Sequence, residues 1–178
     1  MGPVETVALK ILEDYPIYET LPASISGKYH IGETQQQHVQ NAVNVMKHLC
    51  DEFAIEERDR DLLIGATYLH DIGLYIITKL GKSDIVGWKY FAATNYSRHH
   101  ALAALHPIIG AALLDNYNIP RKEEVKRLIA VHMSHWLPMC PPPETFYERL
   151  ICIADYVASR GGGIIAEPKR SAQTHKYK

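Results

Sequence analysis

Apolar residues recur with the spacing of amphipathic helices along most of the chain. The segment from Val4 to Tyr15 has apolar residues at intervals of three and four, and Pro16 ends it. A second helix is predicted to begin at Thr34, because Thr34 and Gln37 fit a capping box in which each side chain bonds to the backbone N–H of the other residue. This periodicity predicts an all-α fold.

The third predicted helix ends in the sequence His70-Asp71-Ile72-Gly73, after an apolar run from Leu62 to Leu69. Asp59 is its predicted N-cap, and Gly73 is predicted to stop the helix in a left-handed conformation. Pro107 fits the first position of a new helix capped by His106. The remaining helices are predicted over residues 101–117 with a break at 106–107, from Pro120 toward His135, and from Glu144 to the glycines at 161–163.

Glycines, prolines and polar stretches divide the chain into three parts. Residues 1–34 are predicted to hold one helix and an irregular segment, residues 35–160 a single helical-bundle domain, and residues 161–178 a flexible tail. Residues 74–100 are predicted to be an irregular insertion in that domain, whose first residues fit a strand or a helical turn equally well.

Length, charge and cysteine content narrow the class of protein. A chain of 178 residues favours one domain with a sizeable core, and the net charge of −1 gives no sign of nucleic-acid or membrane binding. Three widely spaced cysteines argue against a disulfide framework and a zinc knuckle. No apolar run reaches the ~18–20 residues of a membrane span, and no secretory signal is visible, so a cytoplasmic protein is expected. A homodimer is an open alternative.

Ten histidines are present, and several fall where the helical pattern predicts a buried face or a helix end. Burying several titratable groups without a shared partner is costly, whereas a metal ion satisfies imidazoles and carboxylates together. The sequence therefore predicts a metal site. The candidate ligands, from five predicted helices, are His38, His70 with Asp71, His106, His132 and Asp155.

The mixture of four imidazoles and two carboxylates, without a thiolate, favours two ions of Fe, Mn, Co or Zn over a structural zinc site. Asp71 has two oxygens and can bridge the ions. Two ions about 3.5–4 Å apart can activate a water and hold a phosphoryl oxygen, which suits phosphoester hydrolysis.

The order of these residues resembles the HD-domain superfamily over roughly residues 35–160. The resemblance rests on His38, on the His70-Asp71 pair, on the His-Pro-x-x-Gly-Ala motif that starts at His106, on His132 and on the late Ala-Asp-Tyr that contains Asp155. Among these proteins the sequence looks most like the small stand-alone hydrolases that cleave dinucleoside tetraphosphates symmetrically.

The resemblance implies an all-α bundle, a metal-activated water as nucleophile and a small phosphorylated substrate such as a nucleotide. It implies one ion on His38, His70, Asp71 and Asp155, and a second on His106 and His132 with Asp71 shared. The predicted catalytic residues are Asp71, His106 and His135, the last as a proton donor or as a support for a ligand.

One position departs from the family pattern. Many HD hydrolases have a phosphate-binding Lys three residues after the Asp, where this chain has Leu74. The predicted substitutes are Lys79, Arg98, His99 and Arg160, because a guanidinium beside imidazoles suits an anion.

Two other functions stay open at this stage. Some HD-domain proteins use the same six ligands as a di-iron oxygenase, and Tyr29 with Gly32-Glu33 faintly resembles the corresponding motif, although at a shorter spacing. The other alternative is a non-catalytic nucleotide-sensing module, for which a broken ligand set would be expected.

Overall fold

A computed structural model describes residues 1–23, 32–75, 104–160 and 163–168. This described part is all-α, and its sole β feature is an isolated bridge between Pro22 and Thr34. Among the described residues, no helix combines the length and the apolar character that crossing a membrane requires. The helices are α1 (Pro3–Glu13), η1 (Pro16–Glu19), α2 (Gln35–Glu52), α3 (Glu57–Leu69), α7 (His106–Leu113), η2 (Leu114–Asn116), α8 (Lys122–Val131) and α9 (Phe146–Arg160).

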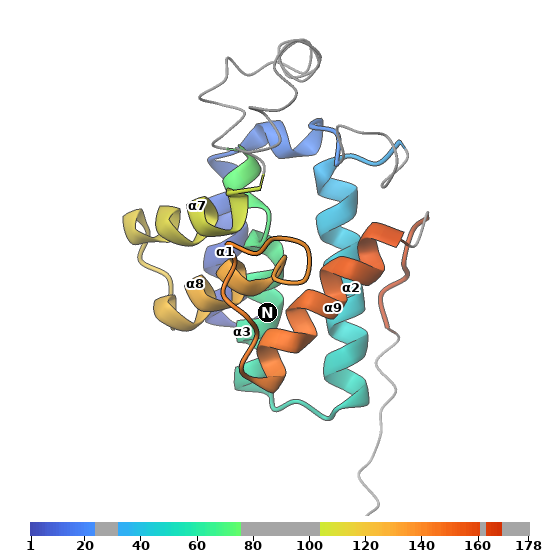
Figure 1. Cartoon of the computed structure of the whole chain (residues 1–178). Helices are drawn as coiled ribbons and strands as arrows, with labels where there is room; N and C mark the ends of the chain where they lie inside the picture. The colour runs from blue at the N-terminus through green and yellow to red at the C-terminus, as the bar shows by residue number, and fades with distance from the viewer. Residues whose placement is uncertain (24–31, 76–103, 161–162, 169–178) are drawn as a thin grey trace, which may run out of the picture.

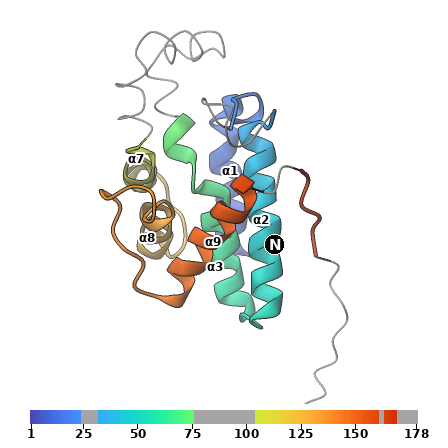
Figure 2. The ribbon, with the colours of Figure 1, turned by 45° about the vertical axis from the view of Figure 1, so that its right-hand side comes forward.

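Helix α3 is central to the bundle and packs against α1, α2, α8 and α9. Figures 1 and 2 show α9 lying beside α2, with α7 and α8 paired on the other side of α3. Nearly every residue from Arg60 to Leu69 is buried, so α3 has no wide polar face. The end of this buried helix, where His70 and Asp71 lie, is therefore also inside the molecule.

Helix α1 is attached to α3 by a close helix–helix contact and by a side chain of α3 that caps the start of α1. A Cβ on Gly65 would lie 2.7 Å from Cγ1 of Val4, so the two helices touch where α3 has no side chain. Asp61 of α3 accepts hydrogen bonds from the first N–H groups of α1, at 2.9 Å from Val4 and 3.0 Å from Glu5. The start of α1 is thus completed by a side chain from another helix.

The capping box that was predicted for α2 is confirmed. The backbone N–H of Gln37 donates to Oγ1 of Thr34 at 3.3 Å, and the backbone N–H of Thr34 donates to Oε1 of Gln37 at 2.9 Å. Helix α2 then places His38 in its first turn with 2% of its surface exposed.

Several predicted helix ends are wrong. Gly73 is not a left-handed stop, because residues 72–75 are helical again and its φ is not positive. Asp59 is not the N-cap of α3, whose N-cap is Glu56; it accepts instead from Arg121 at 2.7 Å. Helix α8 begins after Arg121, which has a left-handed φ of 56°, and not at Pro120.

Gly73 has a different role, which is to let α7 approach the turn after His70. A Cβ on Gly73 would collide with the carbonyl oxygen of His106 and would lie 2.9 Å from the backbone N of Gly110. A Cβ on Gly110 would in turn lie 3.1 Å from the backbone N of Gly73. This backbone contact sets the position of His106 relative to Asp71.

The chain after α9 returns along α2. The side chain of Asn41 donates to the carbonyl of Gly163 at 2.9 Å and accepts from the N–H of Ile165 at 2.9 Å, and Asn44 donates to the carbonyl of Ile165 at 2.6 Å. Of the predicted insertion at 74–100, residues 76–100 lie outside the described residues.

Candidate metal centre

Each predicted ligand lies at a helix end or on a buried face that turns toward one region of the bundle. His38 comes from the first turn of α2, and Asp155 from the inner face of α9. His70 and His132 are the C-cap residues of α3 and α8, and His106 is the first residue of α7. All six predicted ligands are at most 6% exposed.

One group of facing atoms joins α2, α3 and α9. Nε2 of His38 lies 3.1 Å from Nε2 of His70 and 3.2 Å from Oδ1 of Asp155. Oδ2 of Asp71 lies 3.5 Å from both of these imidazole nitrogens. Two nitrogens and two carboxylate oxygens thus converge on a single point.

A second group joins α7 and α8 through the same aspartate. Nε2 of His106 lies 3.0 Å from Nε2 of His132, and these nitrogens are 3.0 and 3.5 Å from Oδ1 of Asp71. Asp71 therefore directs one oxygen to each group. Asp71 thus lies between the two groups, with Oδ2 toward His38 and His70 and Oδ1 toward His106 and His132.

Two of the imidazoles are oriented by the helix ends on which they lie. Nδ1 of His70 donates to the carbonyl of Thr67 at 2.7 Å, and Nδ1 of His132 donates to the carbonyl of Ile129 at 2.6 Å. A proton on Nδ1 leaves Nε2 with a lone pair that can bind a metal. The same local arrangement, a C-cap histidine bonded to the carbonyl three residues earlier, thus prepares one ligand in each group.

The charges of the site favour bound cations. Burial raises the pKa values of Asp71 and Asp155, but the facing imidazoles outweigh it and hold both pKa values below the usual range. Burial lowers the pKa of His70, yet the two carboxylates outweigh it and raise this pKa to about 9. The negative C-terminal ends of α3 and α8 also point to this region.

The donor set fits a metal ion by its own chemistry. The imidazole nitrogens face each other at 3.0–3.1 Å beside two carboxylates, and these are donor groups that can bind a cation between them. Burial lowers the pKa of His132, which favours the neutral imidazole that a metal binds. Within the described parts of the chain, the donor atoms of two groups lie close enough together to hold an ion. One group is His38, His70 and Asp155, and the other is His70, Asp71 and His132.

Two further predicted site residues, His135 and Arg160, are not part of this cluster. His135 follows the end of α8 and is exposed, and its ring lies near those of Trp136 and Tyr156, at 6.0 and 6.3 Å between centroids. Arg160 is an exposed residue of the last turn of α9. Lys79, Arg98 and His99 lie outside the described residues.

Trp136 and Tyr156 were not identified from the sequence, although their rings lie beside both His135 and Arg160. Their spacing was a usable signal. Tyr156 directly follows a predicted ligand, and Trp136 comes four residues after another.

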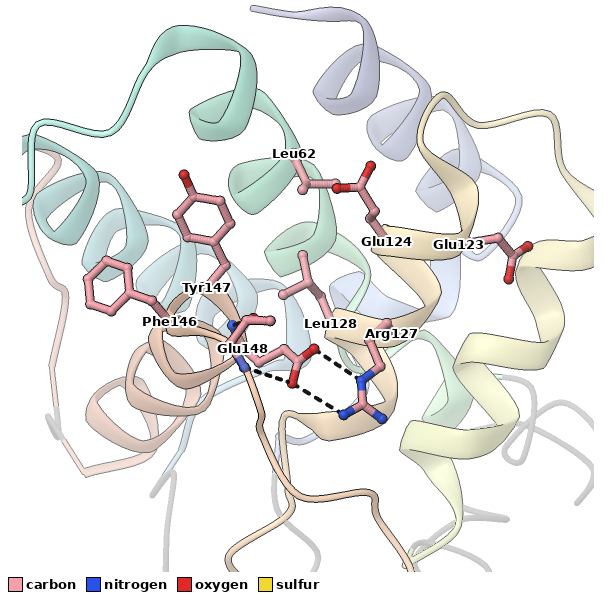
Figure 3. Close-up of a pocket in the computed structure, with 9 residues that line it drawn as sticks. Leu62, Glu123, Glu124, Arg127, Leu128, Phe146, Tyr147 and Glu148 are labelled. Atoms are coloured by element: carbon pink, nitrogen blue, oxygen red, sulfur yellow. Dashed lines mark hydrogen bonds and ion pairs between the residues drawn. The ribbon is translucent and has the colours of Figure 1, made fainter.

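A cavity lies elsewhere in the fold. It has a volume of about 540 Å³, lies between α8 and the start of α9, and has Leu62 and Leu128 in its wall. Figure 3 shows Arg127 and Glu148 paired at this cavity, where Nε of Arg127 donates to Oε1 of Glu148 at 3.1 Å. The described residues that line it include none of the six predicted ligands.

Comparison with known proteins agrees with this geometry. The HD domain family matches residues 36–160, which includes all six predicted ligands. No curated protein and no solved structure gives a significant match. HD domains are in general metal-dependent hydrolases that bind divalent ions. The all-α fold, the two clusters of histidine and aspartate, and the match over most of its length together show that the chain belongs to the HD domain family.

Proposed function

We propose that the protein is a metal-dependent phosphohydrolase that cleaves a phosphoester or phosphoanhydride bond of a nucleotide or a related small phosphorylated compound. The arrangement of Asp71 carries the proposal, because its two carboxylate oxygens face different pairs of imidazoles. Such a carboxylate can bridge two divalent ions, and the donor set suits Fe, Mn, Co or Zn.

The six buried side chains divide into two ligand sets in this proposal. His38, His70, Asp71 and Asp155 hold one ion, and His106 and His132 hold the other with Asp71. Divalent ions held by these residues would lower the pKa of a water and would polarise a phosphoryl oxygen. The carbonyls of Thr67 and Ile129 keep two of the imidazoles in the tautomer that this task needs.

Other residues bind the substrate and move a proton. Arg160 supplies positive charge for a substrate phosphate, together with Lys79, Arg98 and His99. His135 donates a proton to the leaving oxygen. Leu74 packs against the hydrophobic core and so provides no charge at the position where many HD hydrolases have a Lys.

Dinucleoside tetraphosphates are the first substrates to test, since the sequence most resembles the hydrolases that cleave them symmetrically. Symmetrical cleavage would yield two molecules of nucleoside diphosphate. Mononucleotides and nucleoside triphosphates complete the panel.

The test combines metal analysis with a substrate screen. Protein loaded separately with Fe, Mn, Co or Zn is expected to hold two ions per chain and to hydrolyse a member of the panel without consuming oxygen. Oxygen uptake with a reduced iron form would indicate the di-iron oxygenase instead. Fewer than one ion per chain in every preparation, with no turnover, would overturn the hydrolase proposal and favour a sensing module.

A further inference from the structure

The rings of Trp136, from the loop after α8, and Tyr156, from α9, stack on one another. Their rings are nearly parallel, with an interplanar angle of 9° and 6.0 Å between centroids. The guanidinium carbon of Arg160 lies 4.8 Å from the Tyr156 centroid and 5.4 Å from the Trp136 centroid. We call Trp136, Tyr156 and Arg160 the aromatic platform.

The platform is open to ligands. Trp136 is 50% exposed and Tyr156 is 40% exposed, although both are large enough to gain from burial. Exposed, nearly parallel aromatic rings with a guanidinium over them are groups with which proteins stack on planar heterocycles.

The platform also adjoins the metal centre along the chain. Tyr156 follows Asp155 on α9, so one residue turns its carboxylate inward and the next turns its ring outward. Trp136 comes four residues after His132, whose imidazole faces His106. The two segments that supply the rings therefore also supply a ligand to each group of the centre.

The chemistry of the platform matches a nucleotide better than a purely apolar partner. Two parallel rings accept the face of a planar base, and the guanidinium attracts the phosphates that the base carries. An aliphatic protein surface would use neither the parallel rings nor the positive charge.

We propose that the aromatic platform binds the base of a nucleotide whose phosphate lies at the metal centre. The proposal rests on the proposed phosphohydrolase function and adds a substrate class: phosphate esters with a planar base are preferred over those without one. Trp136 and Tyr156 are then specificity residues, and they take no part in the chemistry at the phosphate.

The test compares two compounds with a methylene-bridged P–C–P group that resists hydrolysis; one of them carries a nucleoside and the other does not. Adenosine 5′-(α,β-methylene)diphosphate carries a base, and methylenediphosphonate does not. Isothermal titration of the full chain loaded with Mn²⁺ is expected to give tighter binding of the nucleoside compound. Trp136→Leu and Tyr156→Leu are each expected to weaken its binding about 5- to 150-fold and to leave methylenediphosphonate unaffected.

The controls separate the platform from general effects on the protein. Phe146→Leu removes another exposed aromatic ring of α9, 45% exposed, and is expected to leave both affinities unchanged. Trp136→Phe is a conservative change that keeps an aromatic ring at this position. This variant is expected to retain most of the preference for the nucleoside compound. Metal content and circular dichroism confirm that each variant is intact.

Each alternative outcome is distinct. If wild type binds both phosphonates equally, or the leucine variants keep the preference, the platform is not a base site and the hydrolase proposal stands. If the loaded protein binds neither compound, the phosphohydrolase proposal fails and this one with it. If the leucine variants change the oligomeric state and not the ligand preference, the rings are a contact between copies of the chain, which also overturns the proposal.

Discussion

At the scale of single residues, Asp71 is the group on which the proposed two-ion centre depends. We expect the Asp71→Asn variant to bind fewer ions than the wild type. Its activity is expected to fall by more than the ~10–100-fold loss that is typical when a residue hydrogen-bonded to a metal ligand is removed. The amide has less charge and a single oxygen, so it cannot bridge. Elemental analysis and the rate of phosphate release measure both effects.

Asp115→Asn is the matched control, because Asp115 is an exposed acid that pairs with Lys126 at the surface. It is expected to keep full metal content and activity. A metal content in Asp71→Asn equal to that of this control would show that Asp71 does not bridge two ions.

Gly73 makes a second residue-scale prediction. Gly73→Ala is expected to destabilise the protein by about 1–3 kcal/mol and to reduce metal binding, because the added methyl collides with the carbonyl of His106 and displaces that ligand from Asp71. Chemical denaturation and elemental analysis give the two readouts.

Gly32→Ala is the control for Gly73→Ala, because it strains the backbone without displacing a predicted metal ligand. Gly32 has a φ of +75°, but a Cβ there would have no neighbour within 4 Å. It is expected to cost about 1–2 kcal/mol from the left-handed backbone, with no loss of metal. Equal metal loss in both variants would contradict a specific role for Gly73.

At the scale of helices, the attachment of α1 depends on Asp61. Asp61→Asn removes one of the oxygens that accept from Val4 and Glu5 and places an N–H₂ group against a backbone donor. We expect a loss of about 1–2 kcal/mol of unfolding free energy, similar to the loss of a helix N-cap. Glu52→Gln, at an exposed position of α2, is expected to change the stability little; a similar loss in this variant would mean that charge, and not capping, is responsible.

Helix content and capping followed from local sequence, whereas several helix ends did not. Thr34 and Gln37 are three residues apart, so their capping box is visible in the sequence. Asp59 also has the chemistry of an N-cap, but its actual partners are Arg121 and Tyr147, which are 62 and 88 residues away. A choice between a local and a distant partner is decided by packing, which periodicity does not describe.

The candidate ligands could be selected from the sequence, but the contacts that bring them together could not. Helical pattern and residue type were enough to select His38 and Asp155, and the resemblance to HD domains implied how the ligands divide around Asp71. The approach of α7 to α3, which brings His106 to Asp71, is not visible in the helical pattern. That approach is set by backbone contact at Gly73, which the sequence suggested as a helix stop. For Trp136 and Tyr156 the sequence shows only that each is close to a predicted ligand along the chain; their stacking on one another depends on the packing of the loop after α8 against α9.

At the scale of the whole molecule, bound ions would tie together helices that are far apart in sequence. A ligand at about 100 times its dissociation constant adds about 2.7 kcal/mol, which corresponds to a Tm higher by about 5–10 °C for a chain of this size. Differential scanning fluorimetry is expected to show that the Tm falls by this amount when the ions are removed with a chelator and rises again when Mn²⁺ is added. Asp71→Asn should respond much less, and an equal response would place the stabilising ions elsewhere.

The pH dependence of stability follows from paired carboxyls outside the site. Burial raises the pKa of Glu148, but hydrogen bonds from Arg127 and two backbone N–H groups outweigh it and lower the pKa below 4.5. A carboxyl with a lower pKa in the folded state stabilises the protein above its unfolded pKa, and this contribution disappears as the pH falls. The urea concentration at the midpoint of unfolding is therefore expected to decrease when the pH is lowered below about 4.5. Glu148→Gln should flatten this slope, and an unchanged slope would exclude the Arg127 pair as its source.

His70 and His132 each end a helix and at the same time face an aspartate. The carbonyls of Thr67 and Ile129 belong to the last turns of α3 and α8, where intrahelical partners run out. Exchange of either imidazole for another donor thus also requires a new way to terminate the helix. A redesign of this centre for a different metal must therefore preserve the ends of α3 and α8 as well as supply suitable donor atoms.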